Sequence, residues 1–288
     1  MKKRIQFIIN PISGIGKKNI LPSLIEKNIN HSQFDYEIIY TEHRGHAHEL
    51  AKQAVKDDID VVCVAGGDGS VNEVGSALIG SETILAILPA GSGNGVARHL
   101  GIPLKIDKAI QQINQFRTIT IDTVLLNDKK AIGVSGFGFD ALISKEFDEH
   151  HTRGIFGYIQ VIAREFRHFS GIKVMLDNKK EFTNLLLCSV ANTSQFGNGF
   201  HISPESNNQD GTIELVFVKI PNLFGFIRMV ISSYRKKLHL LKDVEIVSTV
   251  EAVLSVPYRI GHIDGDPVLY EETSIHLKCV PRSLKVII

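Results

Sequence analysis

The sequence predicts an α/β protein in which a parallel-sheet domain precedes an antiparallel β-sandwich domain. Over the first 120 residues, apolar runs such as "IQFIIN", "DVVCVAGG" and "ILAILPAG" alternate with segments of helical period. Continuous apolar strands that alternate with helices are typical of a parallel sheet covered on both faces. Beyond residue 120 helical segments become rare and short alternating strands follow one another, which indicates antiparallel β structure.

The elements of the first half follow in a regular order. Strands are expected at "IQFIIN", "YEIIYT", "DVVCVAGG" and "ILAILPAG", and helices at 17–29, 47–56, 71–78, 94–100 and "IDKAIQQINQ". The stretch "PISGIG" separates the first strand from the first helix as a loop, because glycine and proline favour turns. This half predicts an α/β domain over residues 1–125.

The second half is predicted to be a β-rich domain over residues 126–281. Its strands are expected at "ITIDTVLLN", "AIGVSGFGF", "IKVMLD", "EFTNLLLCSVAN", "TIELVFVK", "VEIVST", "AVLSV", "YRIGHIDG" and "SIHLKCV". Helices are expected at 157–169 and 224–241 only. The last strand, 282–288, is a candidate to return to the first domain and complete it.

Length and composition exclude several classes of protein. The 288 residues suffice for two domains, and the net charge of +1 gives no field that would attract nucleic acid. No run approaches about 18 consecutive apolar residues, so no transmembrane segment is expected. The basic start "MKKRIQFIINP" is interpreted as a first strand, since its apolar run is too short for a signal peptide. Three separated cysteines in apolar runs predict buried, reduced thiols and a cytoplasmic protein.

Two glycine-rich turns follow two of the predicted buried strands. "GGDGS" comes after "VVCVA", and "PAGSGNG" comes after "ILAIL". In an open parallel sheet, ligands bind beyond the carboxyl ends of the strands, and a helix N-terminus there attracts anions. Glycine lets a bulky anion approach the backbone. The two turns therefore predict a phosphate or nucleotide site, although tight turns without a ligand explain either turn alone equally well.

The acid in the first turn, Asp68, needs a separate explanation because a carboxylate repels phosphate. It is compatible with the site if a magnesium ion bridges it to the phosphates, or if it accepts a proton from an attacking hydroxyl group. Neither G-x-G-x-x-G nor G-x-x-x-x-G-K-[ST] is present.

Four motifs together resemble a known family. "NPISGIG", "GGDGSVNEV", "PAGSGNGVARHLGIP" and "DGDP" occur in an order similar to that of the diacylglycerol kinase catalytic-domain family, which includes bacterial lipid kinases and sphingosine kinases. The resemblance covers nearly the whole chain. It implies an NAD kinase-like nucleotide-binding domain, a β-rich lipid-substrate domain and an active site in the cleft between them. It also implies ATP and Mg²⁺ as cofactors.

The resemblance assigns nucleotide contacts residue by residue. It implies roles in ATP binding for Asn10, Thr41, Gly66, Gly67, Asp68, Gly69, Ser70, Asn72, Glu73, Ser92 and Asp264. Asp122 in "TIDTV" matches a further acidic position, and Gly138 and Asp140 match a position to which no role is given. Bacterial diacylglycerol kinases often have Asn-Asp where this chain has Asn94-Gly95, and "GSGNG" looks more like the sphingosine kinase branch.

Metal and proton-transfer roles are also implied. "NNQDGTIEL" resembles a magnesium-binding turn whose ligands would be the carboxylate of Asp210 and the carbonyls of Asn207 and Thr212; an ordinary hairpin turn is the alternative. "GHIDGDP" matches the family's D-G-E motif, with Asp266 in place of the glutamate that would accept the proton of the lipid hydroxyl. Asp266 and Asp68 are thus the candidate catalytic acids.

The function predicted is transfer of the γ-phosphate of ATP to a lipid hydroxyl, on diacylglycerol, a sphingoid base or a related lipid. A soluble NAD kinase-like phosphotransferase and a catalytically degraded nucleotide-binding protein are the alternatives. The segment 221–241 mixes aromatic residues with Arg235, Lys236 and Lys237, so it could rest on an anionic membrane, but a helix packed on the core with a solvated end is favoured. The predicted location is cytoplasmic; a peripheral position at the inner face of the membrane and a homodimer are both left open. Nearly all histidines are expected on the solvated surface, including His150 and His151 in a loop.

Overall fold

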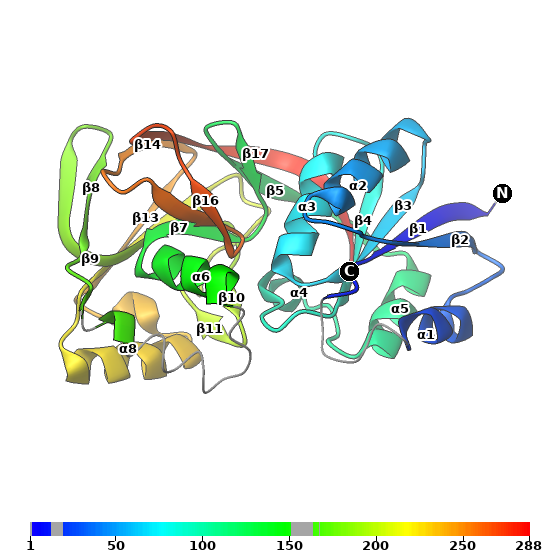
Figure 1. Ribbon diagram of the computed structural model, residues 1–288, viewed down its shortest axis with the longest axis horizontal. Coiled ribbons are helices and arrows are strands. Elements are labelled where there is room, and N and C mark those ends of the chain that lie inside the picture. The colour runs from blue at the N-terminus through cyan, green and yellow to red at the C-terminus, as the bar shows by residue number, and fades with distance from the viewer. Residues whose placement is uncertain (1, 13–19, 151–163, 167) are drawn as a thin grey trace.

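The computed structural model describes residues 2–12, 20–150, 164–166 and 168–288. Two lobes lie side by side along the long axis of the molecule (Figure 1). The N-terminal lobe is built on four parallel strands in the order β4-β3-β1-β2. These are β1 (Lys3–Ile9), β2 (Phe34–Tyr40), β3 (Val61–Gly66) and β4 (Ile84–Pro89). The predicted parallel sheet is confirmed.

Helices cover both faces of this sheet. α2 (His46–Lys56) packs against α3 (Asp68–Leu78), and α1 (Leu21–Asn28) packs against α5 (Ile106–Gln115) on the opposite side (Figure 1). The short α4 (Gly95–His99) follows the second glycine-rich turn. β1, β3 and β4 are buried nearly throughout because both faces are covered, and this explains their uninterrupted apolar sequence.

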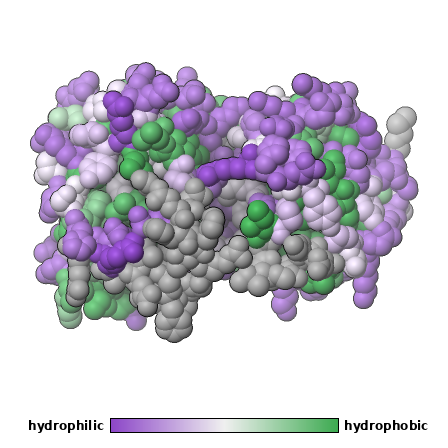
Figure 2. Space-filling model, viewed as in Figure 1, coloured by the Kyte–Doolittle hydropathy of each residue, from purple (hydrophilic) through white to green (hydrophobic). Residues whose placement is uncertain are grey.

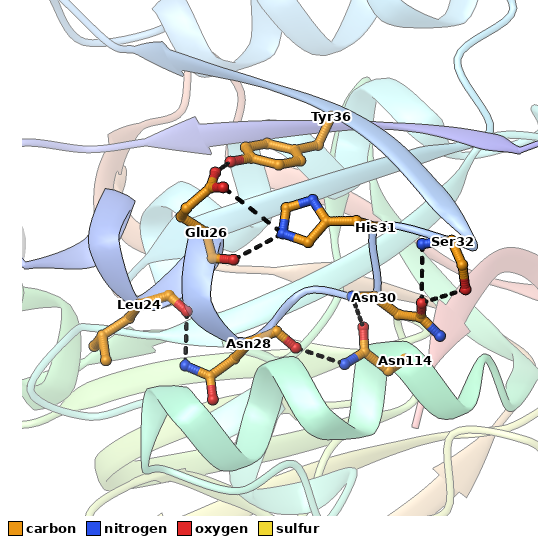
Figure 3. A network of polar contacts seen from close by, with 8 residues as sticks. All are labelled: Leu24, Glu26, Asn28, Asn30, His31, Ser32, Tyr36 and Asn114. Atoms are coloured by element: carbon orange, nitrogen blue, oxygen red, sulfur yellow. Dashed lines mark hydrogen bonds and ion pairs between the residues drawn. The ribbon is translucent and has the colours of Figure 1, made fainter.

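A polar network joins the helices on one face to β2 (Figure 3). The side-chain nitrogen of Asn114 on α5 donates to the carbonyl of Asn28 at 2.7 Å, and its oxygen accepts from the amide of Asn30 at 3.0 Å. The hydroxyl of Tyr36 donates to Glu26, which raises the pKa of Tyr36 to about 12. One asparagine thus satisfies the end of α1 and fixes it against α5.

The C-terminal lobe is a β-sandwich of antiparallel strands. They are β6 (Lys129–Ala131), β7 (Val134–Gly138), β8 (Ile172–Leu176), β9 (Lys180–Ala191), β10 (Gln195–Gly197), β11 (Phe200–His201), β12 (Ile213–Lys219), β13 (Val244–Thr249), β14 (Glu251–Ser255), β15 (Ile260–Ile263) and β16 (Asp266–Leu269). Two apolar clusters fill this lobe: one includes Phe137 and Phe217, the other Phe139 and Met229.

Two long strands belong to both lobes. β17 (Ser274–Ile287) pairs with β14 in the C-terminal lobe and ends beside β4, where Val286 lies opposite Leu85 in parallel register. β5 (Thr118–Leu126) pairs with β17 on both sides of an irregularity between Val280 and Leu284. The carboxyl end of the chain therefore lies in the core of the N-terminal lobe.

Several predicted elements differ from the structure. α3 begins at Asp68 rather than at residue 71, so most of "GDGS" is the first turn of a helix. α6 (Phe139–His150) was not predicted, and His150 lies in this helix rather than in a loop. Residues 13–19, His151 and most of the predicted helix 157–169 lie outside the described residues. The three cysteines are buried and free, as predicted.

The segment 221–241 forms α8 (Leu223–Tyr234) and a short 3₁₀ helix, η1 (Leu238–Leu240). Met229 and Ser233 of α8 are buried, and Met229 belongs to an apolar cluster of the lobe, so one side of the helix packs on the core as expected. The exposed side chains lie along the whole helix rather than at one end. No helix in the described part of the chain reaches the length and hydrophobicity of a bilayer-spanning helix.

Candidate active site

The two glycine-rich turns lie in direct contact at the carboxyl ends of β3 and β4. The amides of Ala90 and Gly91 donate to the carbonyl of Gly66 at 2.9 and 3.1 Å. A Cβ atom added to Gly91 would lie 2.3 Å from the Cα atom of Gly67, a separation that only glycine permits. The structure therefore brings both predicted phosphate turns to one edge of the sheet, beside Asn10 and Thr41 at the ends of β1 and β2.

Asp68 connects the two turns instead of lying in open space between them. Its Oδ1 accepts from the amide of Val96 at 3.2 Å, and a Cβ atom on Gly93 would meet its Oδ2 at 3.1 Å. Burial raises the pKa of Asp68, while hydrogen bonds from the amides of Gly95, Val96 and Asn94 oppose this shift. This carboxylate caps the start of α4 across the turn.

Asp266 approaches the same turn from the C-terminal lobe. A Cβ atom on Gly69 would lie 2.6 Å from Oδ2 and 2.9 Å from Oδ1 of Asp266, so its carboxylate rests against the first turn of α3. Arg44 forms an ion pair with Oδ1 at 3.9 Å, and 45% of the Asp266 side chain is exposed. Of the two candidate acids, Asp266 is the one that solvent reaches more readily.

Asp264 anchors the turn that carries Asp266. Its Oδ2 accepts from Asn72 at 2.7 Å and from the amide of Ile132 at 2.9 Å, and its Oδ1 accepts from the amide of Gly133 at 2.9 Å. Burial raises the pKa of Asp264 to about 6, although these hydrogen bonds favour the charged form. A predicted nucleotide contact thus lies in the interior, where it joins α3 to the β15–β16 turn.

Titration of Asp264 should make stability depend on pH. A folded-state pKa near 6, above the ordinary value of 3.8, means that folding favours the protonated acid. The stabilisation is complete below about pH 4 and is lost as the pH rises through 6, by at most about 3 kcal/mol. The free energy of unfolding of wild type minus that of Asp264→Asn should therefore fall between pH 4 and 7 in urea titrations. A difference that stays constant over this range would contradict the assignment.

The remaining predicted nucleotide residues are held in place by the chain itself. Asn10 donates to Ser70 Oγ at 3.0 Å, and Glu73 Oε1 accepts from the amide of Gly45 at 3.0 Å. Ser92 is exposed at the tip of the second turn, and the amide of Thr41 donates to the carbonyl of Ile9.

The Asn94-Gly95 pair has a steric explanation. A Cβ atom on Gly95 would lie 2.8 Å from the carbonyl oxygen of Gln195 and 3.0 Å from that of Phe196. Because β10 packs against this turn, the structure has no room for an acidic side chain at residue 95.

The predicted metal turn is anchored by Asp122. The buried carboxylate of Asp122 accepts from the amides of Gly211 and Arg282, both at 2.7 Å. Asp210 Oδ1 accepts from the amide and the hydroxyl of Thr212, at 2.9 and 2.8 Å, and Asn207 Oδ1 accepts from the amide of Gln209. The donor set contains oxygen only, with a single carboxylate, and this chemistry fits a hard cation such as Mg²⁺.

Sequence reasoning missed a buried pair behind the β15–β16 turn, which carries Asp266 and is called the catalytic turn in the proposals below. His262 Nδ1 accepts from the amide of Gly265 at 3.2 Å, so Nε2 carries the proton that is donated to Asp140 at 3.0 Å. His262 and His201 are buried and are thus exceptions to the solvated surface expected for nearly all histidines. The sequence signal that could have found it is the position of His262 in "GHIDGDP", two residues before Asp264.

One group of potential metal ligands occurs among the described residues outside the predicted sites. The ligand atoms of His43, His46 and Glu49 lie within 4.8 Å of one another. His46 Nδ1 already accepts from the amide of Glu42 at 3.0 Å, so the ring proton lies on Nε2. Neither nitrogen of His46 then has a free lone pair for a metal ion.

Comparison with known proteins covers both lobes. The family model of the diacylglycerol kinase catalytic domain matches residues 4–126, and that of the YegS C-terminal NAD kinase beta sandwich-like domain matches residues 133–288. The first model covers the N-terminal lobe and the second covers the C-terminal lobe. The chain belongs to the diacylglycerol kinase catalytic-domain family, with its YegS-like lipid kinases, as the motifs predict.

Individual relatives agree with this family. A diacylglycerol kinase of Mycobacterium tuberculosis is 26% identical over 297 residues, which cover 99% of this chain and 94% of the relative. A diacylglycerol kinase of Bacillus subtilis is 28% identical over 244 residues, with 81% and 79% covered.

Solved structures share the fold. A diacylglycerol kinase from Bacillus anthracis superposes with a TM-score of 0.71 at 19% identity, covering 99% of this chain and 96% of that one. An NAD kinase from Archaeoglobus fulgidus, solved with ATP, gives a TM-score of 0.53 at 11% identity, with 99% and 93% covered. The predicted NAD kinase-like architecture is therefore confirmed.

Proposed function

We propose that the protein is an ATP- and Mg²⁺-dependent lipid kinase that transfers the γ-phosphate of ATP to a lipid hydroxyl. The observation that carries this proposal is the contact between Asp266 and Gly69. It places a half-exposed carboxylate from one lobe against the phosphate turn of the other. Membership of the lipid kinase family supports the class of reaction.

The nucleotide would bind where the two glycine turns meet. The N-terminus of α3, at the positive end of the helix dipole, suits a phosphate group. The ATP complex of the related fold from Archaeoglobus fulgidus supports nucleotide use by this architecture. Asn10, Thr41 and Ser92 surround this edge of the sheet and would contact the nucleotide.

Asp266 is the better candidate for the catalytic base. The lipid hydroxyl would lose its proton to Asp266 while its oxygen attacks the γ-phosphorus, and the bond from that phosphorus to the β–γ bridging oxygen breaks to release ADP. Asp68 is less suited to this role, because its carboxylate is largely buried and accepts from backbone amides. Its proposed role is to hold the two turns together.

The turn 207–212 is the proposed metal site. Asp210 and the carbonyls of Asn207 and Thr212 would hold Mg²⁺, which would neutralise negative charge. Asp122 and Asn192 connect this turn to the catalytic turn: Asn192 Nδ2 donates to the carbonyls of Asp122 at 2.9 Å and Ile132 at 2.7 Å, and Ile132 in turn donates to Asp264. Metal binding there would stabilise the lobe that carries Asp266.

The acceptor is proposed to be diacylglycerol, a sphingoid base or a related lipid, taken up at the inner face of a membrane. The test is to incubate the protein with labelled ATP, Mg²⁺ and these lipids dispersed in detergent, and to look for a labelled lipid. In a parallel reaction with NAD⁺ in place of the lipids, the formation of labelled NADP⁺ would favour the NAD kinase-like alternative. Binding of ATP without any labelled product would favour a degraded kinase.

A further inference from the structure

α8 presents an apolar face to solvent. Leu223 and Phe224 are 74% and 82% exposed, and Ile227, Ile231 and Tyr234 are exposed as well. At about 100° per residue, these five side chains fall within an arc of roughly 100° on the helix surface. Figure 2 shows hydrophobic side chains gathered at the lower left of the molecule, where Figure 1 places α8. These five residues are called the α8 face below.

Cations border the α8 face. Arg228 and Arg235 follow the exposed apolar residues at one edge of the face, and Lys236, Lys237 and Lys242 continue beyond the helix, all exposed. No Asp or Glu occurs between residues 221 and 242. Among the described residues, Glu205 reaches this region, with its carboxylate 3.8 Å from His239, and Asp243 follows Lys242. An apolar stripe beside a row of cations suits the surface of an anionic bilayer, where negatively charged headgroups lie above an apolar layer of acyl chains.

Aromatic rings connect the α8 face with the catalytic turn. Tyr234 lies 6.0 Å from Phe200 between ring centroids, Phe200 lies 6.3 Å from Phe196, and Phe196 lies 5.9 Å from His262. His262 in turn binds the amide of Gly265, next to Asp266. The exposed face is thus one end of a continuous row of rings that ends behind the proposed base.

We propose that the α8 face docks the protein on an anionic phospholipid surface. Leu223, Phe224 and Ile227 enter the level of the glycerol backbones, and the cations contact the headgroup phosphates. The proposal rests on the proposed function in one respect: a kinase whose acceptor lies in a bilayer must reach that bilayer. The row of rings then connects the docked face with the catalytic turn.

The test is vesicle co-sedimentation with phosphatidylcholine vesicles that contain or lack phosphatidylglycerol. Wild type should bind the anionic vesicles about tenfold or more tightly than the neutral ones, and added salt should weaken this binding. The double variant Leu223→Ser/Phe224→Ser should lose about tenfold or more of the affinity. Val250→Ser, which alters an exposed apolar residue between β13 and β14, is the matched control and should bind as wild type does.

Activity separates this proposal from the proposed function. With lipid in detergent micelles the double variant should equal wild type, and with the same lipid in anionic vesicles it should be about tenfold slower. If no lipid is phosphorylated in either form, the proposed function fails, while the binding experiment still decides the docking surface. Undiminished vesicle binding by the double variant would overturn the docking proposal. So would sedimentation data showing that wild type is a dimer and the variant a monomer in lipid-free buffer, because the α8 face would then be a self-association surface.

Discussion

Replacement of Asp266 by asparagine is expected to lower kcat for lipid phosphorylation by about 10²–10⁴-fold, with the KM for ATP changed less than about threefold. Asparagine has nearly the same size but cannot accept the hydroxyl proton. Because asparagine keeps the size of Asp266 and its contact with Gly69, nucleotide binding should persist. Steady-state kinetics with ATP varied at saturating lipid measures both quantities.

Two results would change the assignment. Full activity of Asp266→Asn would show that the base lies elsewhere, and Asp68→Asn would then be the variant to measure. An inactive wild type together with an active Asp266→Glu would identify a degraded kinase. We expect Asp266→Glu to keep activity without a large gain, since the shorter carboxylate already reaches the phosphate turn.

Gly69→Ala is expected to lower kcat by roughly 100-fold while leaving the protein folded. The added methyl group would lie 2.6 Å from Oδ2 of Asp266, so the carboxylate must move by a distance on the order of 1 Å. Gly69 lies in the first turn of α3, where alanine is the better helix former by up to about 1 kcal/mol. Thermal unfolding should therefore show no loss of stability beside the loss of activity.

A double-mutant cycle tests whether Gly69 acts through Asp266. In an Asp266→Ala background, Gly69→Ala should cost less than about twofold, because the group that it displaces is already absent. An equal loss in both backgrounds would mean that the methyl group obstructs the nucleotide instead.

The strands of the N-terminal lobe were predictable to within a residue or two at most ends. β1, β3 and β4 are buried on both faces, so their apolar runs begin and end nearly where the strands do. α6 was missed because "GFGF" alternates like a strand at the point where the helix begins. The hydrophobic pattern of a few residues is too short to show the change from the period of a strand to that of a helix.

The candidate site was predictable in its residues but not in their environments. Asp68 and Asp266 each lie in a glycine-containing turn and look alike in the sequence. One is largely buried against amides and the other is half exposed, a difference that depends on which distant turns meet. Asp122 shows the same limit: an acid inside an apolar strand signals a buried partner, but the amides of Gly211 and Arg282 become evident only in three dimensions.

The long strands β5 and β17 have a mechanical consequence. Because both strands pass from one lobe into the other and pair with each other on both sides of the irregularity between Val280 and Leu284, a rotation of the lobes must twist this hydrogen-bonded ladder. We therefore expect large rigid-body closure of the lobes to be costly, and the contact between Gly69 and Asp266 to be largely set when the chain folds. Because the same ladder couples the two lobes, calorimetry should show both of them unfolding in one transition. The N-terminal lobe should need β17, the last strand, as much as it needs β1.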